Sequence, residues 1–362
     1  MYPFSSAQAN GEDWRACVDQ CVAQLQPVAD ASLGFVYWTD TLHADVPEML
    51  QLLRKSTGIE HWVGTVALGV CGQGAVNFDN AALSVMVGAF PKDSFKVFAP
   101  LGAGEQLAEA DEAWLEAQSS HLALVHADQH AASLDAVLQQ LTDAMGGGFL
   151  LGGIGSARAS CPQVADAVVS GGLSGVMFAD EVAVSTRLSQ GCTPIGPTRT
   201  VTKGDSNVIL ELDDRAALDV FKEDIGEVLA RDLSRVGGYI FAGFAVAGSD
   251  TEEYLVRNLV GIDPNKGALA VGEHVRPGDR LMFCRRDPQT AIDDMERMLG
   301  ELAESLGGRQ PKGGIYVSCL ARGPNQFSPP ELEMTLIQKH FGELPVTGFF
   351  ANGEISHDRL YA

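Results

Sequence analysis

The stretch LGFVYWTD (33–40) opens a pattern that this chain repeats three times. An apolar strand ends in a polar turn, an amphipathic helix follows in VPEMLQLLRK (46–55), and a second apolar strand in WVGTVALGVCGQG (62–74) ends in a glycine-rich turn. A helix that joins two neighbouring strands makes them a parallel pair. The pattern therefore predicts a strand–helix–strand unit, and its repetition indicates one local geometry used several times.

Two later parts of the chain follow the same order. The segments of the second and third copies are LALVHADQ (122–129), LDAVLQQLTDAM (134–145) and FLLGGIGSA (149–157), and then GIYVSCLARG (314–323), ELEMTLIQKHF (331–341) and VTGFFANGEIS (346–356). The first two copies continue into an apolar strand, AALSVMVGAF (81–90) and LSGVMFA (173–179), whereas only HDRLYA (357–362) follows in the third. Either the pattern ends differently there or the C-terminal strand is missing, and a missing strand would leave a sheet edge unpaired, which invites association with another chain, such as a homodimer.

Length and composition favour a folded α/β protein with more than one part. The chain has 362 residues, of which 46% are hydrophobic and 20% charged, so it can bury a large interior and is not a disordered chain. Its 40 glycines fall at strand ends, where turns and close approaches of the backbone need them. We predict repeated strand–helix–strand units with mixed sheets flanked by helices, in two subdomains, with a β-rich section before the third copy.

The charge balance and the cysteines limit the partners and the compartment. A formal net charge of −22 argues against nucleic acid and anionic membrane surfaces as partners. The first residues lack the basic and apolar segments of a signal peptide, and no apolar run is long enough to span a membrane. Seven cysteines, an odd number without a disulfide-scaffold spacing, fit a reducing compartment. We therefore expect a cytoplasmic protein without membrane insertion.

Three separated segments resemble the FIST family in sequence and in order. They are QGCTPIGPTRTVTKGDSNVILELDDRAALDVF (190–221), YLVRNLVGIDPNKGALAVGEHVRPGDRLMFCRRD (254–287), and SCLARG with GFFANGEI (318–355). The segment GIEHWVGTVALGVCG (58–72) also fits the N-terminal part of that family. The resemblance covers nearly the whole chain and implies a FIST N-terminal domain over 28–222 and a FIST C-terminal domain over 223–362.

FIST proteins are sensory modules with paired N-terminal and C-terminal parts, so the resemblance implies a sensory protein of intracellular signal transduction that binds a small ligand. The ligand that it implies first is an amino acid or a small carboxylate held between the two domains. One branch of the family resembles haem-containing nitric-oxide sensors, which makes haem the alternative cofactor; otherwise no cofactor is required. The output would pass through a separate signalling protein, such as a histidine kinase or a cyclic-nucleotide enzyme.

Polar residues at the strand ends of the third copy suit such a ligand. Arg322 follows the first strand, and Asn352 and Glu354 follow the second. Parallel strands end at the same edge of a sheet, where open α/β sheets bind ligands. Arg322 can hold a carboxylate through two parallel hydrogen bonds, and Asn352 and Glu354 could bind an amine or a hydroxyl. Structural pairing of Arg322 with Glu354 is the alternative.

Further arginines interrupt or end apolar strands. Arg257 and Asn258 lie within YLVRNLVGID (254–263), and Arg286 follows RLMFC (280–284) by two positions. Since consecutive residues of a strand face opposite sides, one of each neighbouring pair can point inward, and the arginines could form an anion pocket. Pairing with the many acidic side chains of this chain is the alternative.

Histidines and cysteines give fewer indications. His61, at a strand start, and His357 are conceivable axial ligands of a haem, which also needs an apolar pocket. No pair of histidines has the spacing of a metal site. Cys319 lies at a strand end near Arg322, which could stabilise its thiolate, so it is a candidate ligand contact and the candidate nucleophile of a thiol-dependent enzyme. No acid–base pair commits the chain to catalysis, and we expect binding without turnover.

Overall fold

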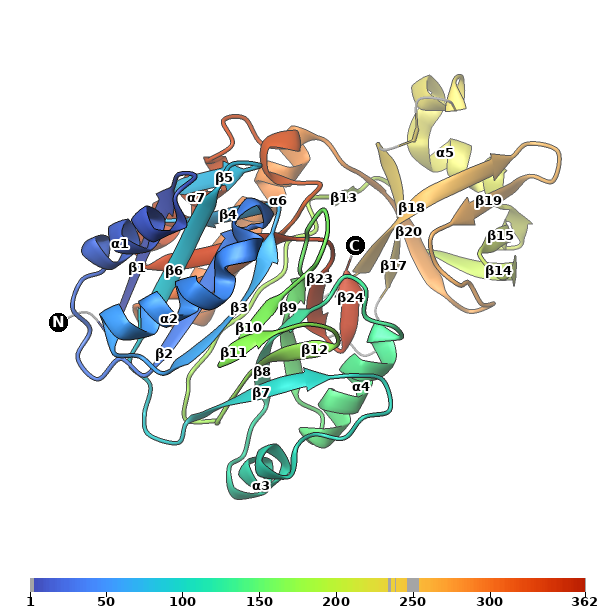
Figure 1. The fold of residues 1–362 in the computed structure, drawn as a ribbon. Coiled ribbons are helices and arrows are strands. Elements are labelled where there is room, and N and C mark those ends of the chain that lie inside the picture. Colours follow the sequence, from blue (N-terminus) through green and yellow to red (C-terminus); the bar gives the residue numbers. More distant parts are fainter. Residues whose placement is uncertain (1–2, 234–235, 238, 246–253, 362) are drawn as a thin grey trace. The chain divides into compact units, whose positions relative to one another are not determined.

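The computed structural model describes residues 3–233, 236–237, 239–245 and 254–361, and the chain forms two compact units. Unit 1 comprises Met1–Arg187 and Leu299–Tyr361, and unit 2 comprises Leu188–Met298 (Figure 1). Both units combine helices with sheets, which confirms the predicted α/β class with mixed sheets. The compact units divide the chain differently from the domains 28–222 and 223–362, which stay a prediction made along the sequence.

One order of elements recurs in unit 1, and the first copy shows it in full. It runs through β1 (Phe4–Asn10), α1 (Trp14–Gln24), β2 (Leu33–Thr39), α2 (Val46–Thr57), β3 (His61–Ala67), β4 (Gly69–Gly72), β5 (Ala75–Phe78) and β6 (Ala82–Gly88), with the short 3-10 helix η1 (Asp40–Asp45) before α2. β2 and β3 are parallel, as a strand–helix–strand unit requires. β4 and β5 form a hairpin, and β6 returns antiparallel to β2, with β1 beside it.

The second copy repeats this order, and the third repeats its central part. The second runs through β7 (Phe95–Leu101), α3 (Glu109–Ala117), β8 (Leu122–Ala127), α4 (Leu134–Ala144), β9 (Phe149–Ile154), β10 (Gln163–Ala165), β11 (Ala167–Val169) and β12 (Leu173–Phe178). The third runs through the end of α6 (Pro288–Ser305), which enters unit 1 at Leu299, and then β21 (Gly314–Cys319), η3 (Gly323–Asn325), α7 (Leu332–Phe341), β22 (Val346–Ala351), β23 (Glu354–His357) and β24 (Arg359–Tyr361). The pairs β8–β9 and β21–β22 are parallel as well, so all three predicted strand–helix–strand units are present.

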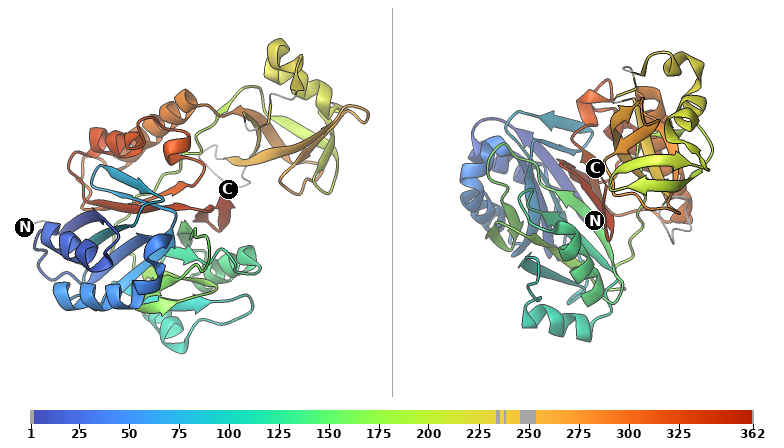
Figure 2. Two further views of the ribbon diagram at one scale, coloured as in Figure 1. Left: turned by 45° about the horizontal axis from the view of Figure 1, so that its top comes forward. Right: turned by 90° about the vertical axis from the view of Figure 1, so that its right-hand side faces the viewer.

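Each of the three copies adds one strand to the sheet of another copy, and the three additions form a closed cycle. The strand that follows the glycine turn of each copy pairs antiparallel with the second strand of a different copy. β4 of the first copy pairs with β22 of the third, β23 of the third with β9 of the second, and β10 of the second with β3 of the first. Every sheet of unit 1 is therefore built from two copies, which brings the first and last parts of the chain together (Figure 2).

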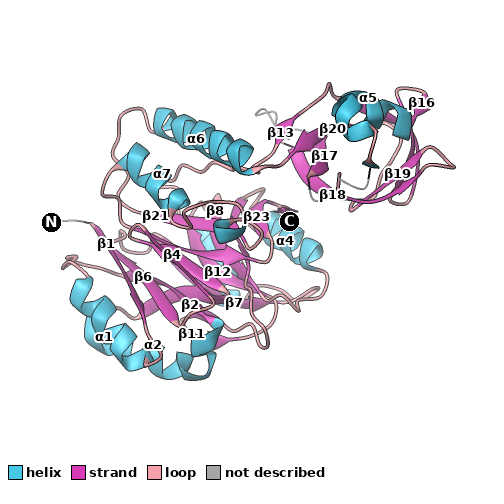
Figure 3. Cartoon of the chain, turned by 90° about the horizontal axis from the view of Figure 1, so that it is seen from above, coloured by secondary structure: helices cyan, strands magenta, loops and turns pink. Residues whose placement is uncertain are grey.

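The inner faces of the three sheets share one apolar core. Phe35 and Tyr37 from β2, Leu124 from β8, Val176 from β12 and Phe349 from β22 all belong to it and are almost completely buried. Helices lie on the outer faces of the sheets, as Figure 3 shows for α1 and α2. In the first sheet β2 is buried over its whole length and β3 from its second residue onward, so these strands read as largely apolar runs rather than as alternating ones.

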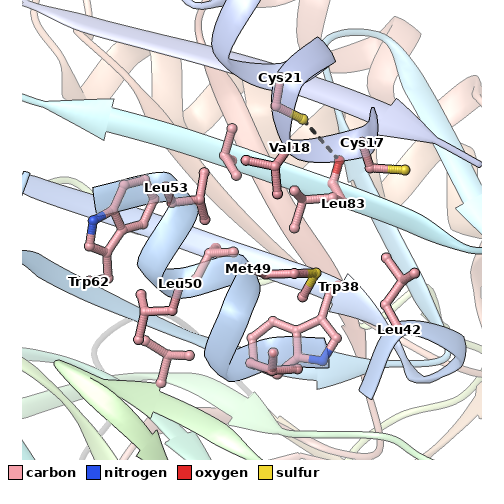
Figure 4. Close-up of a cluster of buried hydrophobic side chains, with 14 of the residues drawn as sticks. Cys17, Val18, Cys21, Trp38, Leu42, Met49, Leu50, Leu53, Trp62 and Leu83 are labelled. Atoms are coloured by element: carbon pink, nitrogen blue, oxygen red, sulfur yellow. Dashed lines mark hydrogen bonds between the residues drawn. The ribbon is translucent and has the colours of Figure 1, made fainter. Parts of the chain in front are cut away.

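A second apolar cluster lies between the first sheet and the helices α1 and α2 (Figure 4). Trp38 of β2 and Trp62 of β3 are buried beneath Met49 and Leu53 of α2. The local sequence of α2 favours a helix of this length, with proline in its first turn, Arg54 and Lys55 in its last turn and a left-handed glycine directly after it. The apolar positions of α2 recur at helical spacing and so face the sheet.

Unit 2 is the β-rich section that the sequence predicts. Its elements are β13 (Thr193–Pro194), β14 (Arg199–Asp205), β15 (Val208–Leu212), β16 (Arg215–Ala216), α5 (Ala217–Ala230), β17 (Ile240–Ala245), β18 (Tyr254–Asp263), β19 (Ala268–Val271) and β20 (Arg280–Arg285). The antiparallel order β20-β14-β15-β19-β18-β17 returns to β20, so the sheet closes on itself. Phe221 of α5 and Phe283 of β20 meet edge to face in its interior, 4.8 Å between ring centroids.

Candidate functional site

The third copy places a buried arginine just beyond the end of β21. The parallel register sets Cys319 beside Ala351, so β21 and β22 end together, and Arg322 and Asn352 follow at the same edge. Arg322 has only 6% of its surface exposed, which is rare for an arginine. Its guanidinium lies over the Phe327 ring, 5.3 Å from the centroid.

A carboxylate at the start of α7 faces this arginine. Glu333 is completely buried, and its Oε1 lies 3.4 Å from the Arg322 Nε. The same oxygen accepts hydrogen bonds from the Tyr316 hydroxyl at 2.6 Å and from the Ser318 hydroxyl at 3.0 Å. Tyr316 and Ser318 are two residues apart on β21 and therefore share the face that α7 covers. We call Tyr316, Ser318, Arg322 and Glu333 the polar cluster.

Burial controls the protonation of the groups around the polar cluster. Removal from water, together with the charge of Glu333, raises the pKa of the Tyr316 phenol well above its usual value, so the hydroxyl remains a donor. Burial and the same carboxylate raise the pKa of the Cys71 thiol on β4. Two buried side-chain atoms have no hydrogen-bond partner among the described residues: the Oε2 of Glu333, within the cluster, and the Nε2 of Gln326, which directly precedes Phe327 in sequence.

The other predicted site residues of the third copy lie around this edge. Cys319 is half-buried, and its sulfur accepts the Ala321 backbone N–H at 3.4 Å. Asn352 has an exposed side chain, and its backbone N–H donates to the Ile154 carbonyl of β9. Glu354 begins β23 opposite Gly153, where the second and third copies meet. All three positions belong to the third copy, at or beyond the ends of β21 and β22.

The remaining predicted residues belong to unit 2. Arg257 forms an ion pair with Glu273, 2.9 Å from Nε to Oε2, and Asn258 is exposed on the same strand, β18. Arg286 donates from Nε to the Cys192 sulfur at 3.3 Å and lies over the Phe241 ring, 4.4 Å from its centroid. The predicted residues thus fall into two groups, one in each compact unit.

The surroundings of the two candidate haem ligands do not fit a haem. The His61 side chain is 52% exposed, and its Nδ1 lies 2.8 Å from the Asp166 carboxylate. His357 is exposed on β23, where its ring meets the Phe149 ring edge to face. Neither imidazole is enclosed by apolar side chains, as an axial ligand in a haem pocket would be. In the described ranges, no group of three or more His, Cys, Asp or Glu residues could hold a metal ion.

Sequence reasoning missed Glu333, although the sequence held a signal for it. Glu333 stands three and four positions before Leu336 and Ile337, which are buried on the face of α7 that meets the sheet. Helical periodicity therefore places this carboxylate within an apolar stripe. A charged residue at such a position needs a buried partner, and Arg322 is the nearest cation in sequence that follows a strand end.

Comparison with known proteins decides the family. A model of the FIST N domain matches residues 32–215, and a model of the FIST C domain matches residues 217–357. The chain belongs to the FIST family. The border between the FIST N and FIST C matches falls inside unit 2. FIST domains point to a sensory protein that binds a small ligand in signal transduction.

Curated relatives of this FIST protein occur in mycobacteria. An uncharacterized protein of Mycobacterium tuberculosis is 29% identical over 321 residues, which cover 85% of this chain and 82% of the relative. An uncharacterized protein of Mycobacterium bovis is 30% identical over 192 residues, which cover 52% of this chain and 49% of the relative. In the part of the FIST chain that the structure describes, no helix combines the length and apolar character needed to cross a membrane.

Proposed function

We propose that this FIST protein is an intracellular sensor that binds an amino acid or a small carboxylate without turning it over. The observation that carries the proposal is the buried Arg322 at the strand end of the third copy, together with the Oε2 of its neighbour Glu333, which is buried without a hydrogen-bond partner among the described residues. Buried polar atoms almost always have hydrogen-bond partners, so such an oxygen next to a buried arginine supports a polar ligand there.

The energetics of the polar cluster also support a role beyond stability. A buried arginine–carboxylate pair contributes little net stability, because the loss of hydration offsets the attraction between the charges. Apolar residues of similar size in the same place would often give an equally stable protein. The guanidinium of Arg322 offers a planar set of donors that matches a carboxylate. The exposed Asn352 and the half-buried Glu354 at the same edge can accept or donate hydrogen bonds to an amine. This combination suits an amino acid.

The signal would leave the protein through a separate signalling enzyme, for example a histidine kinase or a cyclic-nucleotide enzyme. A change at Arg322 can be transmitted to α7, because Tyr316 and Ser318 of β21 donate hydrogen bonds to Glu333 of α7. A ligand that takes over the Arg322 guanidinium would weaken its pairing with Glu333 and shift the equilibrium position of α7.

Calorimetry of the full chain against a panel of amino acids and small carboxylates tests the proposal. We expect one class of compound to bind, and Arg322→Ala and Arg322→Lys to weaken its binding about tenfold or more, since a charge-assisted pair of hydrogen bonds is lost. Asn352→Ala, at an exposed position that the fold tolerates, should weaken the same compound less. Arg15→Ala, an exposed arginine on α1, is the matched control and should leave the affinity unchanged.

Two results would contradict the proposal. If no compound of the panel binds the folded wild-type chain, the ligand is not an amino acid or small carboxylate. If a confirmed ligand binds Arg322→Ala and wild type equally well, while both show the same thermal unfolding, the anchor is not Arg322.

A further inference from the structure

Three sulfur-bearing side chains gather on one face of unit 2. Cys192 and Cys284 are 2% and 0% exposed and belong to one apolar cluster, against which the half-buried Met282 packs. Met282 and Cys284 are two residues apart on β20 and therefore share a face of that strand. The Cys284 thiol is directed toward Met282, whose backbone carbonyl lies 3.9 Å from the sulfur. Two thiols and a thioether thus meet from segments that are far apart in sequence.

The pairing of β13 with β20 places Cys192 diagonally across from Cys284. Pro194 lies opposite Cys284 in the antiparallel register, so Cys192, two positions earlier, faces Arg286. The hydrogen bond from the Arg286 Nε to the Cys192 sulfur, at 3.3 Å, agrees with this position. Because side chains alternate along a strand, Cys192 and Cys284 are diagonal neighbours on the same face of the sheet.

The diagonal spacing of the two cysteines favours a bridging ion over a disulfide. Diagonal neighbours in an antiparallel pair have Cα atoms about 7–8 Å apart, whereas disulfides span Cα separations of about 4.4–6.8 Å. A metal ion between two thiolates adds two metal–sulfur bonds of about 2.3 Å each, so it can bridge the longer separation. The backbone positions of Cys192 and Cys284 therefore suit two ligands of one metal ion.

An arginine beside the two thiols can balance the charge of their thiolate forms. The Arg286 guanidinium reaches the Cys192 sulfur through its Nε and lies over the Phe241 ring of the same cluster. Burial and the neighbouring Cys192 raise the pKa of the Cys284 thiol to about 12, whereas Arg286 lowers it. A metal ion bound to both sulfurs would remove their protons outright, and the guanidinium would then offset the remaining negative charge.

A second pair of cysteines, in unit 1, has different surroundings. Cys17 and Cys21 are one turn apart on α1, and their thiols donate to two different backbone carbonyls, those of Gly11 and Leu83. The charged group that acts on Cys17 is the Asp13 carboxylate, which raises the thiol pKa together with burial and so disfavours a thiolate. Buried cysteines as such are therefore not the signal; the signal is their combination with a thioether and a cation.

We propose that Cys192, Cys284 and Met282 form a binding site for monovalent copper, Cu(I), in unit 2. Soft thiolate and thioether ligands select Cu(I), and this ion tolerates fewer ligands than the tetrahedral sites of structural zinc. The described residues contain no group of three or more His, Cys, Asp or Glu that could hold a metal ion, and a site of two thiolates and a thioether agrees with that finding. Binding replaces two S–H bonds by two Cu–S bonds and releases two protons to the solvent, and the copper stays monovalent.

Competition with the Cu(I) chelator bathocuproine disulfonate, on the reduced full chain without oxygen, measures the affinity of this site. Cys192→Ser and Cys284→Ser should each weaken Cu(I) binding about hundredfold or more, since removing groups that only support a metal ligand already costs about 10–100-fold. Met282→Leu keeps the size and apolar character of the side chain and should weaken binding about tenfold. The double variant Cys17→Ser/Cys21→Ser is the matched control and should bind Cu(I) as wild type does.

Two measurements on the wild type identify the ligands without any variant. X-ray absorption at the copper edge of the Cu(I)-loaded chain should show sulfur neighbours alone, at about the length of a metal–thiolate bond, 2.3 Å. The affinity for Cu(I) should increase with pH below the pKa of the thiols, because binding releases their protons. These measurements keep the test valid if a cysteine variant fails to fold.

Several outcomes would overturn the proposal. Equal Cu(I) affinity of the wild type and of a folded Cys192→Ser/Cys284→Ser variant would show that these thiols do not hold the ion. Nitrogen or oxygen neighbours in the absorption spectrum would place the copper at another site, as would a loss of binding in the Cys17→Ser/Cys21→Ser control. Wild-type affinity in Met282→Leu would overturn the role of the thioether.

Discussion

His126 is a buried histidine at the point where the three copies of unit 1 meet. Its ring, on β8 of the second copy, contacts Tyr37 of the first copy and Phe349 of the third, with centroids 5.5 Å and 5.8 Å away. The His126 Nε2 lies 3.2 Å from the Tyr37 hydroxyl, and its Nδ1 is buried without a hydrogen-bond partner among the described residues. Burial lowers the pKa of His126 to about 3, so the ring is neutral in the folded protein.

This histidine should make the folded protein less stable in mild acid. In the unfolded chain a histidine has a pKa of about 6.5, whereas the folded pKa of His126 is about 3. As pH falls below the unfolded pKa, only the unfolded chain takes up the proton, and the free energy of unfolding decreases. Between pH 7 and pH 5 the free energy of unfolding decreases by about 2 kcal/mol through His126, and it decreases further until the pH reaches the folded pKa.

Urea unfolding at the two pH values measures the effect. The double variant Tyr37→Phe/His126→Phe removes the titrating ring without leaving the tyrosine hydroxyl unpaired. We expect its stability to fall less than that of wild type over the same pH range. His130→Asn, at an exposed histidine four residues away, should keep the wild-type pH dependence. A double variant that loses as much stability in acid as wild type would show that His126 is not the group responsible.

Single residues also show what the sequence could and could not reveal about the site. The sequence predicts that Arg322 and Asn352 lie at the same edge of the sheet, because β21 and β22 are parallel, end together and are followed closely by these two residues. The partner of Arg322 is not obvious from neighbouring positions, because Glu333 reaches it from the next helix. The burial of Arg322 depends on the apolar residues that surround it, such as Phe327, and these contacts are tertiary.

Among the elements, the second strands of the three copies share a glycine at the same place. Gly64 lies opposite Val36, Gly152 opposite Val125, and Gly348 opposite Tyr316 in the parallel registers. In each case a Cβ atom on the glycine would overlap the backbone carbonyl oxygen of its neighbour on the first strand. The two strands of each copy therefore approach more closely than any other residue would allow.

Alanine at one of these glycines should open the strand pair. Gly348→Ala forces β21 and β22 apart, since the overlap is with backbone rather than with a mobile side chain. We expect a loss of about 2–3 kcal/mol, as for overpacked cores. Gly300→Ala is the matched control, because Gly300 lies within α6 and a Cβ there meets no atom.

The control should change stability in the opposite direction. Alanine restricts the unfolded chain more than glycine does, so Gly300→Ala should stabilise the protein by about 0.5–1 kcal/mol. Urea unfolding of both variants against wild type gives the comparison. Equal effects of the two substitutions would contradict the close approach at Gly348.

The strand–helix–strand units could be predicted from the sequence, whereas the pairing of strands between different copies could not. Strands and helices follow from local periodicity, which is visible in each copy. The pairing of β4 with β22 joins residues near the start and the end of the chain, and no local pattern indicates such a partner. The same reason applies to unit 2, whose strands are visible in sequence but whose closure depends on the long-range pair β17–β20.

For the whole molecule, the separate cores of the two units predict separate unfolding. The described clusters around Trp38, around Val125 and around Tyr37 draw all their residues from unit 1. The cluster of Cys192, Phe241, Val256 and Cys284 belongs entirely to unit 2. Units with their own cores often unfold as separate cooperative transitions. Because unit 2 is inserted into unit 1, its unfolding need not break any strand pair of unit 1.

Calorimetry of the full chain and of two variants tests this independence. Phe283→Ala removes a completely buried ring of unit 2 and should cost that unit about 3–5 kcal/mol, while Gly348→Ala weakens only unit 1. We expect two unfolding transitions: Phe283→Ala should lower the midpoint temperature of the unit 2 transition alone, and Gly348→Ala that of the unit 1 transition alone. If both variants shift one common transition to the same extent, the two units unfold as one, because strain in either core would then be felt by the whole chain.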